Sequence, residues 1–214
     1  MDELIRKIID ISWTSYKNKV ASGLFTPENE KMMQLQFAQT FQTISPLFEY
    51  NRNESIKILL EQAVNIDREP KKRIIDLVIS HSLDSTVTYY PIELKCFRKH
   101  TRDNLNNLRG AQNLGMYDYW VDIENIEQYS KIANYGFGTH LVLTDDEYYV
   151  TGKHQGDQVK VYSTNKNKIN VTGLLEHKIA NRQGKIELTG NYSMTTWEKI
   201  GDYYFIRQEN NNAT

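Results

Sequence analysis

Three charged residues interrupt two apolar segments of the chain. Asp76 lies inside the run 74–79, and Glu93 and Lys95 lie inside the run 92–97. Side chains alternate across a strand, so Glu93 and Lys95 are expected to share one face of the second segment. An ionised group in a core is costly unless it is paired or bound to a metal ion. Three such charges within 20 positions therefore require a structural or a chemical explanation.

The three charges allow two interpretations. The simpler one is a buried ion pair between Lys95 and either Asp76 or Glu93, which leaves the second carboxylate unbalanced. The other adds a divalent cation, and Mg²⁺ prefers hard oxygen ligands such as carboxylates, water and phosphate oxygens. A bound metal ion lowers the pKa of its water and stabilises charge on a phosphate. The lysine would then orient or deprotonate that water, or balance charge in the transition state.

The pattern of Asp76, a gap of 16 residues, and Glu93-Leu94-Lys95 resembles the PD-(D/E)xK nuclease superfamily, the fold of many restriction endonucleases. In that family an aspartate ends one strand and Glu-x-Lys lies on the next. Ile75 stands where the family pattern has proline. The resemblance implies that Asp76 and Glu93 bind Mg²⁺ together with the carbonyl of Leu94, and that Lys95 is the catalytic lysine. Mn²⁺ is expected to substitute for Mg²⁺.

Further residues are candidates by the same resemblance. Many members add an acidic or amide group from the helix that precedes the strands, and Glu30 resembles this auxiliary metal ligand, with Gln36 as the alternative. An acid in the first turn also favours the helix dipole, which gives Glu30 a second explanation. A subgroup carries Gln and Tyr on the helix after the lysine. Gln112 and Tyr117 match this loosely, and Gln112 is equally expected as a plain helix residue.

The resemblance also implies a fold and an activity. The fold would be α/β, with a mixed central β-sheet flanked by helices, restriction-endonuclease-like, in one domain over residues 1–214. The activity would be that of a metal-dependent endodeoxyribonuclease, of the type II restriction kind or from a related defence or mobile-element setting. DNA is the expected partner, and a homodimer would allow both strands to be cut. The alternatives are a non-cleaving nucleic-acid-binding or assembly subunit of the same fold, and an RNA-processing nuclease.

Hydrophobic spacing predicts the elements that must position these residues. Helices are expected over 2–20, from Thr26-Pro27-Glu28 to a break near Ser45, and over 55–64, 104–120 and 126–133. Short, β-branched segments predict strands over 73–79, 89–97, 139–144, 186–188 and 203–207. Pro91 is expected at the start of its strand, because proline cannot donate to a sheet ladder.

Composition sets the remaining limits. The chain has 214 residues, 25% of them charged and 39% apolar, which is ordinary for one globular domain. The 26 basic and 27 acidic residues exclude a uniformly basic coat for nucleic acid, although residues 95–109 and 153–185 carry local basic excesses. A single cysteine, Cys96, excludes an internal disulfide or a Cys-rich zinc site and fits a reducing, cytoplasmic compartment. No segment predicts a membrane span.

Overall fold

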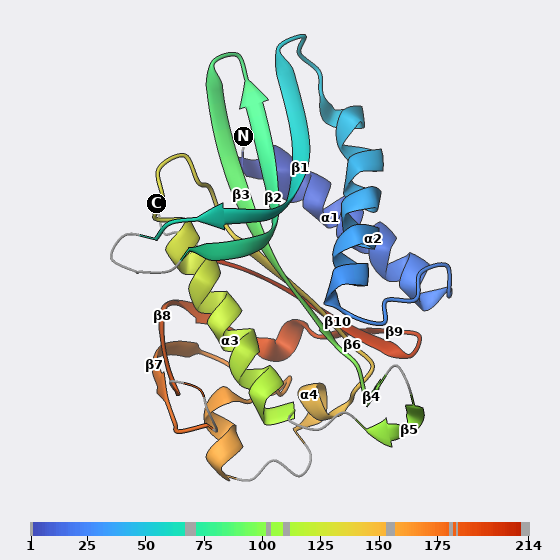
Figure 1. Ribbon diagram of the computed structural model, residues 1–214, viewed down its shortest axis with the longest axis vertical. Coiled ribbons are helices and arrows are strands. Elements are labelled where there is room, and N and C mark those ends of the chain that lie inside the picture. Colours follow the sequence, from blue (N-terminus) through green and yellow to red (C-terminus); the bar gives the residue numbers. More distant parts are fainter. Residues whose placement is uncertain are drawn as a thin grey trace.

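The computed structural model describes residues 2–66, 72–101, 104–108, 112–152, 157–179, 182 and 184–210 (Figure 1). Its helices and 3₁₀ turns are α1 (Asp2–Ala21), α2 (Glu30–Ile44), η1 (Ser45–Phe48), α3 (Gln112–Tyr129), α4 (Tyr148–Thr151), η2 (Asp157–Tyr162) and η3 (Met194–Thr196). Its strands are β1 (Glu54–Val64), β2 (Arg73–Leu83), β3 (Thr86–Phe97), β4 (His100–Thr101), β5 (Asn104–Leu108), β6 (Thr139–Thr144), β7 (Val171–Glu176), β8 (Lys185–Tyr192), β9 (Glu198–Ile200) and β10 (Tyr203–Glu209).

Six strands form a central mixed sheet in the order β1-β2-β3-β6-β10-β9. Strands β3 and β6 are parallel, and the other neighbours are antiparallel. The parallel pair needs a crossover connection, and α3 lies within it. The pairs β4-β5 and β7-β8 are separate two-stranded sheets. The expected α/β fold with a mixed central sheet is therefore confirmed.

Helices cover both faces of this sheet (Figure 1). Helices α1 and α2 pack on one face, where Trp13 and Phe37 join Leu94 and Cys96 of β3 in one apolar cluster. Helix α3 and the β7-β8 pair form the second cluster, to which β6 contributes Val142. In the sheet, Lys95 pairs with Val142. The predicted alternation along β3 is therefore confirmed, with Leu94 and Cys96 facing α1 and α2 and Lys95 facing α3.

The two N-terminal helices occur as predicted, with a different start for the second. The expected start at Thr26-Pro27-Glu28 is wrong, because α2 begins at Glu30 with Asn29 as its N-cap. The side-chain oxygen of Asn29 accepts a hydrogen bond of 2.9 Å from the N–H of Met32, which satisfies a donor that the first turn would otherwise leave free. The break near Ser45 is confirmed, since the 3₁₀ turn η1 begins there with Pro46 in its first turn.

The helix expected over 55–64 is wrong, because this segment is strand β1. It pairs with β2 from Glu54 opposite Leu83 to Val64 opposite Arg73. Its apolar residues Ile56 and Ile58 are spaced by two, and both contact the cluster under α1 and α2. That period of two fits a strand with one buried face, and long-range pairing with β2 overrides a helical pattern this short.

The expected position of Pro91 is also wrong, because Pro91 lies inside β3, opposite Val78 of β2. Main-chain groups alternate between the two sides of a strand. The main chain of Tyr89 bonds to Asn134 and Gly136, on the side of β3 that faces away from β2. The nitrogen of Pro91 points to that same side, just before β6 begins at Thr139. No ladder hydrogen bond to β2 is lost there.

The helices expected over 104–120 and 126–133 are one helix, α3, which runs from Gln112 to Tyr129. Residues 104–108 form strand β5 instead. The strands expected over 73–79, 139–144, 186–188 and 203–207 are confirmed within β2, β6, β8 and β10. Within the described residues, no helix is long and apolar enough to cross a bilayer.

Candidate active site

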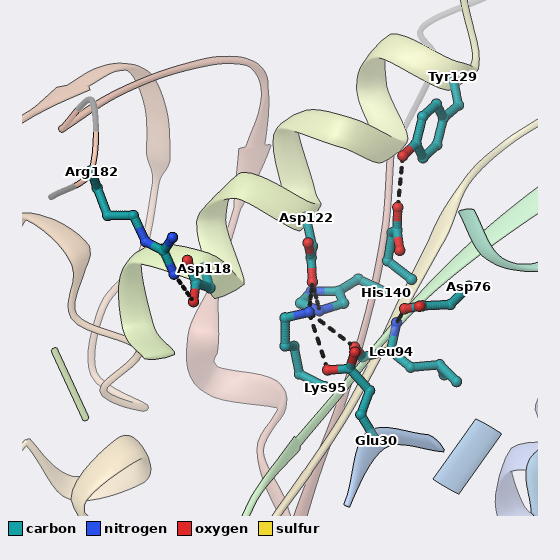
Figure 2. Close-up of polar contacts among 10 residues, drawn as sticks. Glu30, Asp76, Leu94, Lys95, Asp118, Asp122, Tyr129, His140 and Arg182 are labelled. Atoms are coloured by element: carbon teal, nitrogen blue, oxygen red, sulfur yellow. Dashed lines mark hydrogen bonds and ion pairs between the residues drawn. The ribbon is translucent and has the colours of Figure 1, made fainter. Parts of the chain in front are cut away.

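Asp76 lies at an irregular point of strand β2. The ladder between β1 and β2 skips Asp76 and the residue opposite it, Glu61, whose φ of +51° is in the left-handed region. Ile75 packs against α3, whereas Leu77 packs in the cluster under α1 and α2. Residues two apart share a face in a regular strand, so the strand changes orientation at Asp76. The carboxylate of Asp76 accepts a hydrogen bond of 2.9 Å from the N–H of Leu94 on β3 (Figure 2).

The sheet brings Asp76 next to Glu93. Leu77 pairs with Ile92 in the antiparallel ladder, which makes Asp76 and Glu93 the next positions on β2 and β3. Helix α2 contributes an amide here, since Nε2 of Gln34 lies 2.5 Å from the carbonyl oxygen of Asp76. The alternative auxiliary residue predicted from the sequence was Gln36. The structure instead places Gln34, two residues earlier on α2, against Asp76.

Lys95 is contacted by oxygens from three elements of the fold. Its Nζ lies 2.9 Å from Oδ2 of Asp122 on α3, 3.2 Å from Oε2 of Glu30 on α2, and 3.3 Å from the carbonyl oxygen of Leu94 on β3 (Figure 2). The predicted site residues Glu30, Leu94 and Lys95 therefore converge. Glu30 belongs to the first turn of α2, which brings its carboxylate to the ammonium group 65 residues away.

The surroundings of Lys95 keep its side chain charged. Burial alone would lower the pKa of the ammonium group, but the carboxylates of Asp122 and Glu30 outweigh burial and the pKa is raised. The Lys95 side chain is 18% exposed. Lys95 therefore acts as a fixed cation in this arrangement rather than as a proton acceptor.

Burial raises the pKa of three carboxyl groups in this site, so it favours their neutral form. Glu93 is 4% exposed, and its Oε1 accepts a hydrogen bond of 2.8 Å from the hydroxyl of Tyr129. Burial, followed by the charges of Asp122 and Asp76, raises the pKa of Glu93 well above its usual range. Burial also raises the pKa of Asp122 to about 7, although Lys95 opposes the shift. Burial likewise raises the pKa of Glu30. For Glu30, Glu93 and Asp122, nearby positive charge therefore does not offset the cost of burying an ionised carboxylate.

The donors at this site fit a hard divalent cation. Asp76 and Glu93 are neighbouring carboxyl groups, and the carbonyl of Leu94 supplies a neutral oxygen, which together are ligands that Mg²⁺ prefers. Within the described part of the chain, no three His, Cys, Asp or Glu side chains already stand in an arrangement that would hold a metal ion. The set predicted from the sequence needs two carboxylates and a main-chain oxygen, and its third carboxylate, Glu30, is engaged by Lys95.

Two residues of the site were missed by the sequence analysis. Asp122 lies on α3 between the buried Tyr119 and Ile126, so a charged residue inside an apolar helical stripe was the available signal. His140 lies in β6, all of whose residues are buried. It pairs with Glu93 in the parallel ladder, which places both side chains on the face toward α3. The predicted candidates on α3, Gln112 and Tyr117, have other neighbours.

Those neighbours lie outside the cluster around Lys95. Nε2 of Gln112 is 3.5 Å from Oδ2 of Asp146, and the ring of Tyr117 packs edge-on against Tyr162. The helix residue that reaches the lysine is therefore Asp122.

The local basic excesses are partly neutralised in the structure. Arg98 bonds to Asp145 through Nε at 2.9 Å, and Arg182 pairs with Asp118 of α3 at 3.1 Å (Figure 2). Other members of these predicted excesses, Arg102, Arg109 and Lys153, lie outside the described residues. Arg98 and Arg182 are thus less available for phosphate contacts than the sequence suggests.

Comparison with known proteins gives no match to this chain, whether against protein-family models, curated proteins or solved structures.

Proposed function

We propose that the chain is a Mg²⁺-dependent endodeoxyribonuclease that hydrolyses DNA phosphodiester bonds, with a restriction-endonuclease-like core. The observation that carries the proposal is the convergence of Glu30, Asp76, Glu93 and Lys95 from α2, β2 and β3. The pattern expected from the sequence resemblance requires an aspartate on one strand and Glu-x-Lys on the next. The adjacent antiparallel pair β2-β3 and the preceding helix α2 agree with that requirement.

Each residue of the site would have a distinct role in hydrolysis. Asp76, Glu93 and the carbonyl of Leu94 would hold the Mg²⁺ ion, which supplies an acidic bound water and charge stabilisation at the phosphate. Lys95 offers a fixed positive charge beside them, suited to binding a phosphate oxygen or to balancing charge in the transition state. Asp122 and Glu30 fix the position of that ammonium group.

The experiment is cleavage of supercoiled and linear plasmid DNA by the wild-type chain with Mg²⁺, with Mn²⁺ and with EDTA. Asp76→Ala and Lys95→Ala are tested in parallel, with circular dichroism as a check on folding. We expect metal-dependent cutting by the wild type and its loss in both variants. Cutting that survives Lys95→Ala would contradict the assigned site. An RNA substrate in competition separates a ribonuclease from a deoxyribonuclease.

A second candidate is a non-cleaving nucleic-acid-binding or assembly subunit of the same fold. It is favoured by the ion pairs of Lys95, since an ammonium group already paired with Asp122 and Glu30 also suits a purely structural network. A wild-type chain that binds DNA without cutting it, and keeps this binding after Lys95→Ala, would support this candidate.

A further inference from the structure

His140 is a buried polar side chain with no conventional partner. It is fully buried in β6, and neither ring nitrogen has a hydrogen-bond partner among the described residues. Most buried polar side-chain atoms in folded proteins do have a partner. The ring of Tyr119 packs against the imidazole at 4.7 Å between centroids, which fixes its position without satisfying its nitrogens.

A carboxylate oxygen of the site already described lies close to the ring. Nε2 of His140 lies 3.5 Å from Oδ2 of Asp122, the same oxygen that contacts Lys95 (Figure 2). This separation is long for an N–H···O hydrogen bond, which spans about 2.7–3.2 Å. Two ligand atoms each about 2.1 Å from one metal ion lie roughly 3.0 Å apart at a right angle and roughly 3.4 Å apart in a tetrahedron. The observed gap lies near the tetrahedral value and above the right-angle value of the octahedral geometry usual for Mn²⁺.

Protonation and charge are compatible with a cation between these two atoms. A metal-bound imidazole must be neutral, and the full burial of His140 disfavours the charged form of its ring. The four carboxyl groups of the site are Glu30, Asp76, Glu93 and Asp122. Lys95 pairs with two of them, Glu30 and Asp122, so these five residues, if fully ionised, would carry three excess negative charges.

We propose that His140 and Asp122 form a second cation position beside Asp76 and Glu93, which takes a divalent transition-metal ion such as Mn²⁺ in preference to Mg²⁺. An imidazole nitrogen favours transition metals, whereas Mg²⁺ favours oxygen ligands alone. Two protein ligands leave the remaining positions for water or for phosphate oxygens. The inference rests on the proposed function for what the second ion would serve, but metal binding can be measured without any cleavage.

The test is the electron spin-echo envelope modulation of Mn²⁺ bound to the full chain. A Mn²⁺ ion ligated by imidazole shows coupling to ¹⁴N, which oxygen ligands cannot produce. We expect this coupling in the wild-type chain, its persistence in a tenfold excess of Mg²⁺, and its loss in His140→Gln. We also expect His140→Gln to weaken Mn²⁺ binding by about tenfold or more, while Mg²⁺ binding stays unchanged.

His81→Gln is the matched control. His81 is also buried in the central sheet, but its Nε2 lies 2.9 Å from Glu54, so its loss should leave the ¹⁴N coupling intact. Absence of coupling in the wild type, or its survival in His140→Gln, would overturn the inference, and the wild-type spectrum needs no variant to fold. If the coupling is present but the wild type cuts no nucleic acid, the second cation position stands and the nuclease proposal fails.

Discussion

Helix α3 carries two buried carboxylates, Asp122 and Glu127, whose surroundings differ. Glu127 accepts four hydrogen bonds of 2.7 to 2.9 Å, from the main-chain N–H groups of Thr189 and Gly190 and from the hydroxyls of Thr189 and Tyr192. Asp122 has an ammonium group at 2.9 Å and an imidazole at 3.5 Å. Both residues are less than a tenth exposed.

The comparison shows how a buried charge that holds a fold differs from one suited to chemistry. The four donors on Glu127 come from β8, so this carboxylate ties α3 to the β7-β8 pair and has little capacity left for a ligand. Asp122 is surrounded by other titratable groups and keeps a raised pKa of about 7, mainly because of burial. Perturbed groups of this kind gather at functional sites.

The largest difference is expected in cleavage. Asp122→Asn should lower the cleavage rate by about 100-fold, because Lys95 loses its 2.9 Å partner. Asp122→Glu, which keeps the carboxylate, should recover part of the rate. Glu127→Gln should cut within a few-fold of the wild type. Plasmid nicking at saturating Mg²⁺ measures all three, and equal losses in Asp122→Asn and Glu127→Gln would remove the distinction between the two carboxylates.

For the free energy of unfolding, Glu127→Gln should have the larger effect and Asp122→Asn the smaller. Glu127→Gln should lower the free energy of unfolding by about 2 kcal/mol, because charge-assisted hydrogen bonds from β8 are lost. Asp122→Asn should leave the free energy of unfolding unchanged or raise it, because it removes one of several crowded buried carboxylates. Urea unfolding at pH 7 gives both values. A larger loss in Asp122→Asn than in Glu127→Gln would mean that Asp122 is primarily structural.

The pH dependence of stability should separate the two carboxylates further. The pKa of Asp122 in the folded state, about 7, lies above its unfolded value of 3.8, so the folded chain binds more protons between these values. The free energy of unfolding should therefore fall as pH rises from 4 to 7. Asp122→Asn should reduce this fall by up to about 4 kcal/mol, since each pKa unit corresponds to about 1.4 kcal/mol, and Glu127→Gln should keep it. Urea unfolding at intervals across this range measures the slopes, and identical slopes in the wild type and Asp122→Asn would refute the assignment.

The smallest effect is expected at a third acid of α3. Asp118 pairs with Arg182 at 3.1 Å, and both side chains are at least a third exposed. Water and salt screen such a pair, so Arg182→Ala should change the free energy of unfolding by less than about 0.5 kcal/mol and leave cleavage unchanged. A thermal melt and the same nicking assay test this. A marked loss of cleavage would instead give Arg182 a role in DNA binding.

Three residues of the site were predictable because their positions follow from the local pattern of apolar and charged residues. Asp76, Glu93 and Lys95 interrupt apolar strands, and a buried charge is visible in the sequence wherever its neighbours are apolar. The strand over 55–64 was predicted as a helix because a short apolar run has no unambiguous period. Pairing with β2 along the whole segment decided its structure. The sequence predicted Gln36 as the auxiliary residue, whereas Gln34 contacts Asp76. The rotation of α2 about its axis against β2, which decides between the two, cannot be derived from spacing alone.

The sequence by itself determined which charged side chains share a face of the central strand, because alternation along β3 places Glu93 and Lys95 together whatever the rest of the chain does. Only the tertiary structure decided which groups complete the site. Asp122 reaches Lys95 because α3 crosses that face of the sheet, and His140 lies beside Glu93 because β6 pairs with β3 in this register. Both contacts join residues far apart in the chain, and packing of whole elements, which no local pattern encodes, brings them together.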